Sequence, residues 1–197
     1  MTIRISIAVL LLLGSAVIMV WSMNHTSELR LTVKGNDELG IKLELPYLKE
    51  SPADVIITNN SNQSLLAYKI RWESIKYNGE IVERNSIKYH PEALLEKNQE
   101  KRKQLLISQP LLPPNTKWFV GLGRENRQIS GKVPSLEEVG RDSELFPDLK
   151  EYKQINVTLD AAMLENGKVV GRDPAAFDKE INNLVSEYLK FLKELNK

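Results

Sequence analysis

The sequence predicts a mainly β protein. The expected fold is an antiparallel, immunoglobulin-like β-sandwich, preceded by a transmembrane or signal helix and followed by a C-terminal amphipathic α-helix. Short segments that alternate apolar and polar residues are typical of half-buried strands. Asn-Gly pairs and Pro-rich corners separate these segments, as in hairpin-connected sheets. Residues 5–23 carry no charge, and residues 174–196 repeat apolar side chains at helical spacing.

Three parts of the chain follow from these patterns. Residues 1–23 form the membrane anchor or signal peptide, and residues 24–173 form the sandwich, with an irregular insertion at 124–152. Residues 174–197 form the C-terminal helix, packed on or beside the sandwich. About 170 residues after the anchor are enough for one domain with a sizeable core.

The N-terminal apolar segment has two interpretations. As a retained anchor, it is long enough to cross the hydrocarbon core, and Arg4 on its short leading side keeps the N-terminus cytoplasmic. Trp21 would then lie at the far interface, with the domain on the extracytoplasmic side. As a signal peptide, it would be cleaved near Ser22, leaving a secreted or periplasmic domain. We favour the anchor, since the segment is long and lacks an Ala-x-Ala site.

Strands are predicted wherever the alternation is clear. They cover residues 29–34, 41–45, 54–58, 65–72, 117–122 and 154–164. In the fourth strand, Leu66, Tyr68, Ile70 and Trp72 are expected to share one face. The apolar residues of the last strand are likewise expected on one face, at positions 155, 157, 159, 161 and 163.

Connecting segments are read from turn and capping residues. Asn78-Gly79 and Asn166-Gly167 predict hairpins with type I′ turns. Residues 91–104 fit either a short exposed helix or a polar loop, and residues 105–108 are expected to begin a strand. Residues 135–138 form a capping-box pattern, which predicts one short helix within 124–152.

The C-terminal helix carries a heptad pattern. Asp173 is the expected N-cap and Pro174 the first helical residue. The apolar positions 177, 181, 184, 188, 191 and 195 alternate steps of four and three. Further apolar residues widen this stripe, so packing on the chain's own sheet is favoured over pairing with a second copy.

Composition excludes several classes of protein. The chain has no cysteine, which removes disulfides, thiolate catalysis and cysteine-based zinc sites. Lys and Arg total 27 against 26 Asp and Glu, so the net charge of +1 argues against nucleic-acid binding. The sequence contains no catalytic constellation and no nucleotide-binding loop, and we expect no enzyme activity and no cofactor.

Few residues invite a chemical role. His25 and His90 stand alone and are expected to be ordinary surface histidines. Asp160, Glu165 and Asp173 could hold calcium together, but they lack dense alternating carboxylates, so strand-face and N-cap roles are expected.

The basic run at residues 101–103 lies between glutamates, and we expect a solvated turn rather than a site for lipid headgroups.

Two blocks of the sequence resemble a family. Residues 55–72 join an Asn-Asn-Ser turn to a strand containing Ala-Tyr, and residues 157–173 join Leu-Asp to Asn-Gly-Lys-Val-Val-Gly-Arg-Asp. This pattern resembles uncharacterised exported bacterial proteins with an immunoglobulin-like domain. The resemblance implies export and the fold class, and it carries no activity or site residues.

The expected function is therefore binding. We expect a membrane-anchored extracytoplasmic module that binds a partner protein or scaffolds an assembly, with residues 124–152 as the contact surface because Phe146 and Tyr152 lie in that loop. One alternative is a carboxylate-dependent hydrolase or carbohydrate-active enzyme. Another alternative is a structural dimer, a weak homodimer held by the C-terminal helix.

Overall fold

The computed structural model describes residues 28–47, 50–121, 127–139, 146 and 148–195. The predicted membrane or signal helix at 1–23 lies outside this part of the chain. Within the described part, no helix combines the length and apolar character needed to cross a bilayer.

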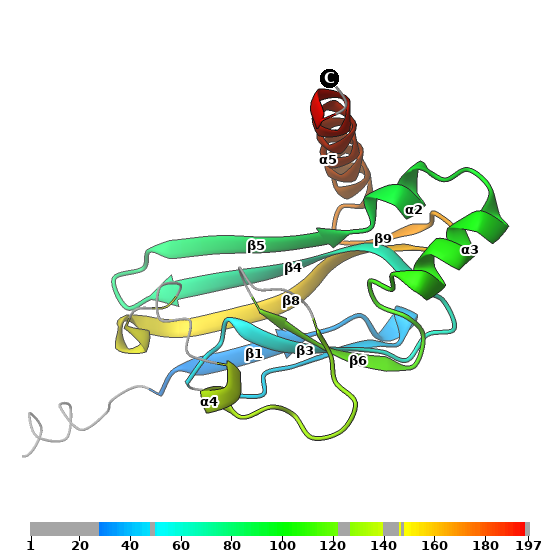
Figure 1. The fold of residues 1–197 in the computed structure, drawn as a ribbon. Coiled ribbons are helices and arrows are strands. Elements are labelled where there is room, and N and C mark those ends of the chain that lie inside the picture. The colour runs from blue at the N-terminus through cyan, green and yellow to red at the C-terminus, as the bar shows by residue number, and fades with distance from the viewer. Residues whose placement is uncertain (1–27, 48–49, 122–126, 140–145, 147, 196–197) are drawn as a thin grey trace, which may run out of the picture.

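Two β-sheets face each other and enclose the main core (Figure 1). The first sheet has the strand order β1 (Arg30–Lys34), β8 (Tyr152–Leu164), β4 (Leu65–Lys76) and β5 (Ile81–Tyr89), with β9 (Val169–Gly171) also beside β8. The second sheet has the order β2 (Ile41–Glu44), β3 (Asp54–Asn59), β6 (Thr116–Gly121) and β7 (Arg127–Gln128). The predicted pair of packed sheets is confirmed.

The first sheet is mixed rather than antiparallel. β1 runs parallel to β8, with Arg30 opposite Gln154 and Lys34 opposite Thr158, whereas the second sheet is antiparallel throughout. Alternation along a strand shows which residues share a face but not the direction of the neighbouring strand. The prediction of antiparallel pairing is therefore wrong for this edge.

Trp72 lies at the centre of the core between the sheets. Its side chain is fully buried, and its Nε1–H donates a hydrogen bond of 2.8 Å to the Pro52 carbonyl oxygen. Tyr68 and Ile70 face the second sheet beside it. The indole is thus packed and hydrogen-bonded, which is what a buried Trp requires.

A bulge in β4 changes one predicted face. Leu66 is an extra residue in the pairing of β4 with β8. As a result, Leu66 and Ala67 both lie in the apolar cluster on the outer side of the first sheet. Tyr68, Ile70 and Trp72 face inward as predicted, but the expectation that Leu66 joins them is wrong.

A second bulge changes the face of β8. Asp160 is extra, because consecutive residues of β4 pair with Ala161 and then Leu159. A bulge shifts the alternation by one residue. The apolar residues of β8 from 155 to 159 therefore face the second sheet, whereas Ala161 and Met163 face outward. The prediction of one continuous apolar face is wrong beyond Leu159.

Helices cover the outer face of the first sheet at one end (Figure 1). They are α2 (Pro91–Leu95), α3 (Gln99–Ser108) and the start of α5 (Pro174–Leu195), and the protein mixes helices and strands more evenly than predicted. The cluster beneath them consists of Leu66, Ala67, Ala93, Leu106, Ala161, Met163, Phe177 and Ile181. Residues 105–108 end α3 instead of beginning a strand, because Leu106 fills this cluster.

Shorter helices lie in the connections: η1 (Asp37–Leu39), α4 (Leu136–Val139) and η2 (Leu149–Glu151). The predicted capping box of α4 is confirmed, since the backbone N–H of Ser135 donates to Glu138 Oε2 and that of Glu138 donates to Ser135 Oγ. The backbone hydrogen bond from Ser135 lowers the pKa of the Glu138 carboxyl.

Both Asn-Gly hairpins form, but with a different turn. Gly79 and Gly167 have φ angles of 88° and 83°, whereas the preceding asparagines have no positive φ. The hydrogen bonds from Lys76 N to Glu80 O and from Leu164 N to Lys168 O each enclose three residues. These are three-residue loops closed by a left-handed glycine, not type I′ turns.

α5 packs on the domain through its first half only. Asp173 caps it as predicted, accepting a hydrogen bond of 3.0 Å from Ala176 N. Phe177 and Ile181 are buried against the sheet, while Phe191 is 54% exposed. Figure 1 shows α5 rising away from the first sheet toward its C-terminal end. The expected packing of the whole stripe on the chain's own sheet therefore holds for the first half alone.

Candidate binding surfaces

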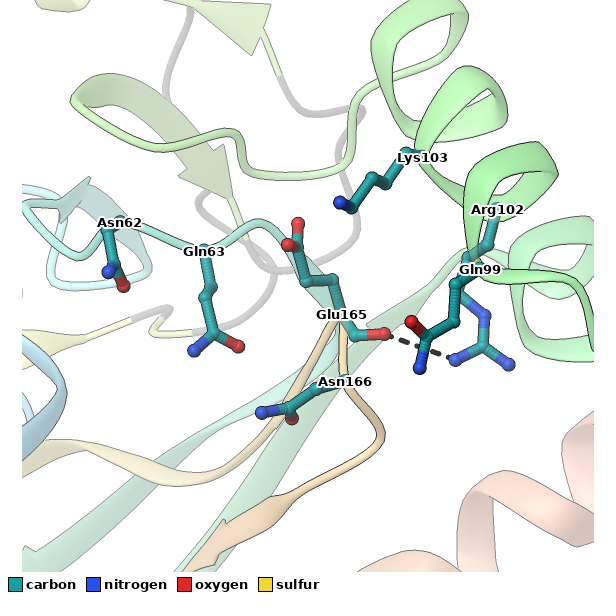
Figure 2. Close-up of a pocket in the computed structure, with 7 residues that line it drawn as sticks. All are labelled: Asn62, Gln63, Gln99, Arg102, Lys103, Glu165 and Asn166. Carbon is teal, nitrogen blue, oxygen red and sulfur yellow. Dashed lines mark hydrogen bonds between the residues drawn. The ribbon is translucent and has the colours of Figure 1, made fainter.

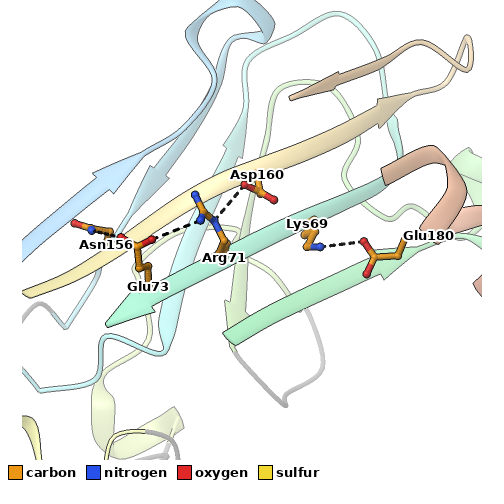
Figure 3. Close-up of polar contacts among 6 residues, drawn as sticks. All are labelled: Lys69, Arg71, Glu73, Asn156, Asp160 and Glu180. Atoms are coloured by element: carbon orange, nitrogen blue, oxygen red, sulfur yellow. Dashed lines mark hydrogen bonds and ion pairs between the residues drawn. The ribbon is translucent and has the colours of Figure 1, made fainter. Parts of the chain in front are cut away.

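The outer face of the first sheet carries a row of paired charges (Figure 3). Arg71 on β4 lies between two carboxylates, with Nε 3.2 Å from Asp160 Oδ1 and Nη1 3.6 Å from Glu73 Oε2. Asn156 Nδ2 donates to Glu73 Oε1 at 3.0 Å. Asp160 is thus the partner of Arg71, which agrees with the strand-face role expected from the sequence.

The same row of charges fixes the base of α5. Lys69 Nζ lies 2.9 Å from Glu180 Oε2 on the second turn of the helix. This lysine side chain is only 18% exposed, so water screens the pair less than it would a pair at the surface. The contact orients α5 relative to the sheet, and it does not leave an open charge for a ligand.

A polar pocket of about 330 Å³ lies where two turns meet α3 (Figure 2). The turns are joined by the hydrogen bonds from Glu165 N to Ser64 O and from Ser64 N to Glu165 Oε2. Arg102 on α3 donates to the backbone oxygens of Glu96 and Glu165. The basic run at 101–103 therefore belongs to a helix, and the expectation of a turn is wrong.

The lining of this pocket suits small polar ligands. Its residues are Asn62, Gln63, Gln99, Arg102, Lys103, Glu165 and Asn166. Figure 2 shows Lys103 and Glu165 extending toward the same space, with the amides around them. Amide groups both donate and accept, so such a lining matches hydroxyl-bearing or amide-bearing molecules. No spacing in the sequence indicates this pocket, because its residues lie in three separate segments.

Those two turns belong to the blocks of the sequence that resemble exported bacterial proteins. Asn59 Oδ1 accepts from the backbone N–H and the hydroxyl of Ser61, and its Nδ2 donates to the Leu112 carbonyl oxygen. The strands of the blocks, β4 and β8, pair directly along most of their length. The Asn-Asn-Ser turn and the Asn-Gly hairpin are therefore neighbours in space.

His90 is buried, which contradicts the expectation of a surface histidine. It is 6% exposed and caps α2, with Nδ1 accepting a hydrogen bond of 3.2 Å from Ala93 N. A neutral ring that accepts at Nδ1 carries its proton at Nε2. Nε2 is buried and has no hydrogen-bond partner among the described residues. His25 lies outside the described residues.

A second pocket, of about 400 Å³, adjoins His90. It is bounded by the start of α2, by residues 109–111 and by α5, and its lining consists of Tyr89, His90, Pro91, Glu92, Gln109, Pro110, Leu111 and Tyr188. The lining combines aromatic and apolar side chains with the polar side chains of Glu92 and Gln109. We call this space the Tyr188 pocket.

The insertion at 124–152 does not present its aromatic residues. Phe146 and Tyr152 are both buried, with ring centroids 5.7 Å apart in a T-shaped contact, and Arg84 lies over the Phe146 ring. The expectation that these rings form a contact surface is wrong, because they complete the core between the sheets. Residues 122–126, 140–145 and 147 of this region lie outside the described part.

Carboxylates are spread among the pockets rather than paired. Glu165 lines the polar pocket and Glu92 lines the Tyr188 pocket. A third pocket beside α4, lined by Arg127, Lys132, Val133, Pro134, Ser135 and Glu138, contains one carboxylate. In the described segments, no group of three or more His, Asp or Glu is arranged to hold a metal ion.

The distal half of α5 exposes apolar side chains. Leu189, Phe191 and Leu195 are 38%, 54% and 66% exposed. Such a row beyond the contact with the sheet is an apolar surface on an otherwise polar helix. The heptad spacing in the sequence indicates this row, but not which part of it the domain covers.

No protein-family model, curated protein or solved structure matches the chain.

Proposed function

We propose that this protein is a membrane-anchored extracytoplasmic module that binds a partner protein. The exposed apolar half of α5 carries the proposal. Phe191 and Leu195 are exposed to water, and covering them with a partner would lower the free energy of the complex. The charge-free segment 5–23 supports the anchor, with Arg4 keeping the N-terminus cytoplasmic. If the segment is cleaved, the same module is periplasmic or secreted.

The arrangement of the domain agrees with this proposal. The described chain enters through β1 at one end, whereas α5 rises from the opposite end of the first sheet (Figure 1). An anchor before β1 would thus leave α5 free to meet a partner away from the bilayer. We also propose the immunoglobulin-like class and membership of the exported bacterial family, supported by the two packed sheets and by blocks 55–72 and 157–173.

Site-specific photocrosslinking in cells tests the binding function. A photoreactive phenylalanine analogue is placed at Phe191 of the full-length chain and, as a matched control, at Ile107, which is also exposed on a helix. We expect a discrete protein adduct from position 191 and none from position 107. Absence of an adduct at 191, or the same adducts at both positions, would contradict the proposal. Fractionation of the intact chain with soluble intracellular protein would contradict the location.

A carboxylate-dependent hydrolase is the second candidate function. Glycosidase chemistry needs two carboxyl groups roughly 5–10 Å apart across a cleft. Each of the three pockets above is lined by a single carboxylate. The observation that favours a hydrolase is the polar, amide-lined pocket around Glu165. Hydrolysis of an oligosaccharide panel by wild type but not by Glu165→Gln would establish it.

A further inference from the structure

We infer that the distal half of α5 and the Tyr188 pocket together bind an amphipathic α-helix of a partner protein, one whose apolar face has a basic edge and an acidic edge. The inference rests on the proposed binding function and adds the chemistry of the partner. Three features carry it: the apolar face, its charged edges and the pocket beside it.

The apolar face is continuous along the helix. Consecutive residues in an α-helix are about 100° apart, so residues spaced by three and four lie on one side. The buried Phe177 and Ile181 start this face, and it continues through Leu184, Val185, Tyr188, Leu189, Phe191, Leu192 and Leu195. The domain covers the first part, through Val185, and the exposed part has the length of about two helical turns.

The two edges of the exposed face have opposite charge. Glu187 and Glu194 lie seven residues apart, along the side next to Phe191. Lys193 lies beyond the other side, next to Leu189. A facing helix gains attraction when its edge along the glutamates is basic and its other edge is acidic.

A second copy of this chain fits that face less well. In an antiparallel pair of helices, identical edges meet, so the Glu187 edge would face the same edge of the other copy. In a parallel pair, the faces would also have to meet at Phe177 and Ile181, where each helix is covered by its own sheet. A foreign helix with complementary edges avoids both conflicts.

The Tyr188 pocket adds a specific contact. Tyr188 belongs to the apolar face and also lines the pocket, so a helix on the face can place one side chain beside Pro91, Pro110 and Leu111. Glu92 and Gln109 line the same pocket, so an apolar side chain with a polar tip matches its lining.

Binding of designed peptides to the full-length chain in lipid nanodiscs tests this inference. The probe is a fluorescein-labelled, three-heptad helix with leucines on one face, lysines on one edge and glutamates on the other. The control peptide has the same leucines and glutamates on both edges. We expect fluorescence anisotropy to show at least tenfold tighter binding of the probe than of the control peptide.

Variants on the apolar face then locate the site. Phe191→Ser should weaken probe binding at least tenfold and Tyr188→Ser should also weaken it, whereas Ile107→Ser should leave it unchanged. The double variant Glu187→Lys, Glu194→Lys has two basic edges, and it should bind the control peptide better than the probe. Circular dichroism of each variant confirms that the fold is retained.

Several results would overturn the inference. Equal binding of both peptides, or no inversion in the double variant, would exclude recognition by the charged edges. Light scattering that finds a dimer which Phe191→Ser dissociates would assign the face to a second copy instead. If position 191 crosslinks to a protein in cells but the chain binds both peptides equally, this inference is overturned and the proposed function is kept. If there is neither an adduct nor selective peptide binding, both are overturned.

Discussion

Arg71 and Asp160 lie side by side on the outer face of the first sheet, with Nε and Oδ1 separated by 3.2 Å. Asp160 is the extra residue of the bulge in β8, and the ion pair ties this bulge to β4 (Figure 3). Arg71 Nε is buried and makes no aligned hydrogen bond within the described part of the chain, so the charge of Asp160 is its main compensation. This pair therefore stabilises the position at which β8 changes face.

Replacing Asp160 by Ala should lower the free energy of unfolding by about 1–3 kcal/mol, since it leaves a partly buried guanidinium without its closest counter-charge. Urea denaturation measures this change. The exposed Glu83→Ala on β5 is the control, and we expect less than about 0.5 kcal/mol there. An equal effect of the two substitutions would show that the pair does not stabilise the bulge.

Gly171 should not tolerate a side chain. Its φ is 142°, and a Cβ there would overlap the Asp160 carbonyl oxygen and lie 2.6 Å from Ala161 Cα. Gly167→Ala is the matched control, since its φ is also positive but open space surrounds it. Thermal unfolding should show a loss of about 1–2 kcal/mol for Gly167→Ala from backbone strain alone. Gly171→Ala should lose clearly more free energy of unfolding than Gly167→Ala. Equal losses would contradict the close approach of Gly171 to the backbone of Asp160 and Ala161.

Trp72→Phe tests the hydrogen bond at the centre of the core. It removes the donor to the Pro52 carbonyl oxygen and leaves a cavity, so the free energy of unfolding should fall by about 2–4 kcal/mol. Trp118→Phe is the control, because this half-buried indole donates only to Thr116 Oγ1. In guanidinium denaturation, the free energy of unfolding of Trp72→Phe should be well below that of Trp118→Phe. The reverse order would place the centre of the core elsewhere.

Lys76 and Glu80 form an ion pair whose effect on stability depends on pH. The hydrogen bond between their side chains, 3.0 Å long, lowers the pKa of the Glu80 carboxyl and raises the pKa of the Lys76 amine. The carboxylate contribution is present above the unfolded pKa of Glu80 and is lost as the pH falls through its lowered folded pKa. The ammonium contribution is present below the unfolded pKa of Lys76 and is lost as the pH rises through its raised folded pKa.

NMR titration of the Glu80 side-chain carboxyl carbon measures how strongly Lys76 lowers the pKa of this group. Lys76→Met should raise the pKa of Glu80 toward its ordinary value, because the main cause of the lowering is removed. Lys103→Met on α3 should leave that pKa unchanged. A Glu80 pKa that does not respond to Lys76→Met would show that the pair does not form in solution.

The sequence predicts the elements of this fold better than their faces. The strands predicted from clear alternation form, because alternation and turn residues act over a few neighbouring positions, whereas the strand expected to begin at residues 105–108 is the end of α3. The bulges at Leu66 and Asp160 are not visible in that alternation, since an apolar residue such as Ala161 suits either the core between the sheets or the cluster beneath the helices. Because both faces of the strand contact apolar clusters, the sequence does not show where a bulge reverses the inward and outward positions.

The candidate binding surfaces show the same limit. The heptad of α5 is readable from the sequence, but only the structure separates the covered Ile181 from the exposed Phe191. His90 and Phe146 give no local sign of burial, because their neighbours in space come from distant segments. The parallel contact of β1 with β8 is equally non-local.

That contact dictates the order of assembly. Arg30 reaches Gln154 only after nearly the whole domain has been synthesised, so a chain emerging N-terminus first holds its opening strand without a partner. The first sheet is consequently completed only after β8 has been synthesised. Until then, the edge of β1 is open to chaperones and to pairing with other chains.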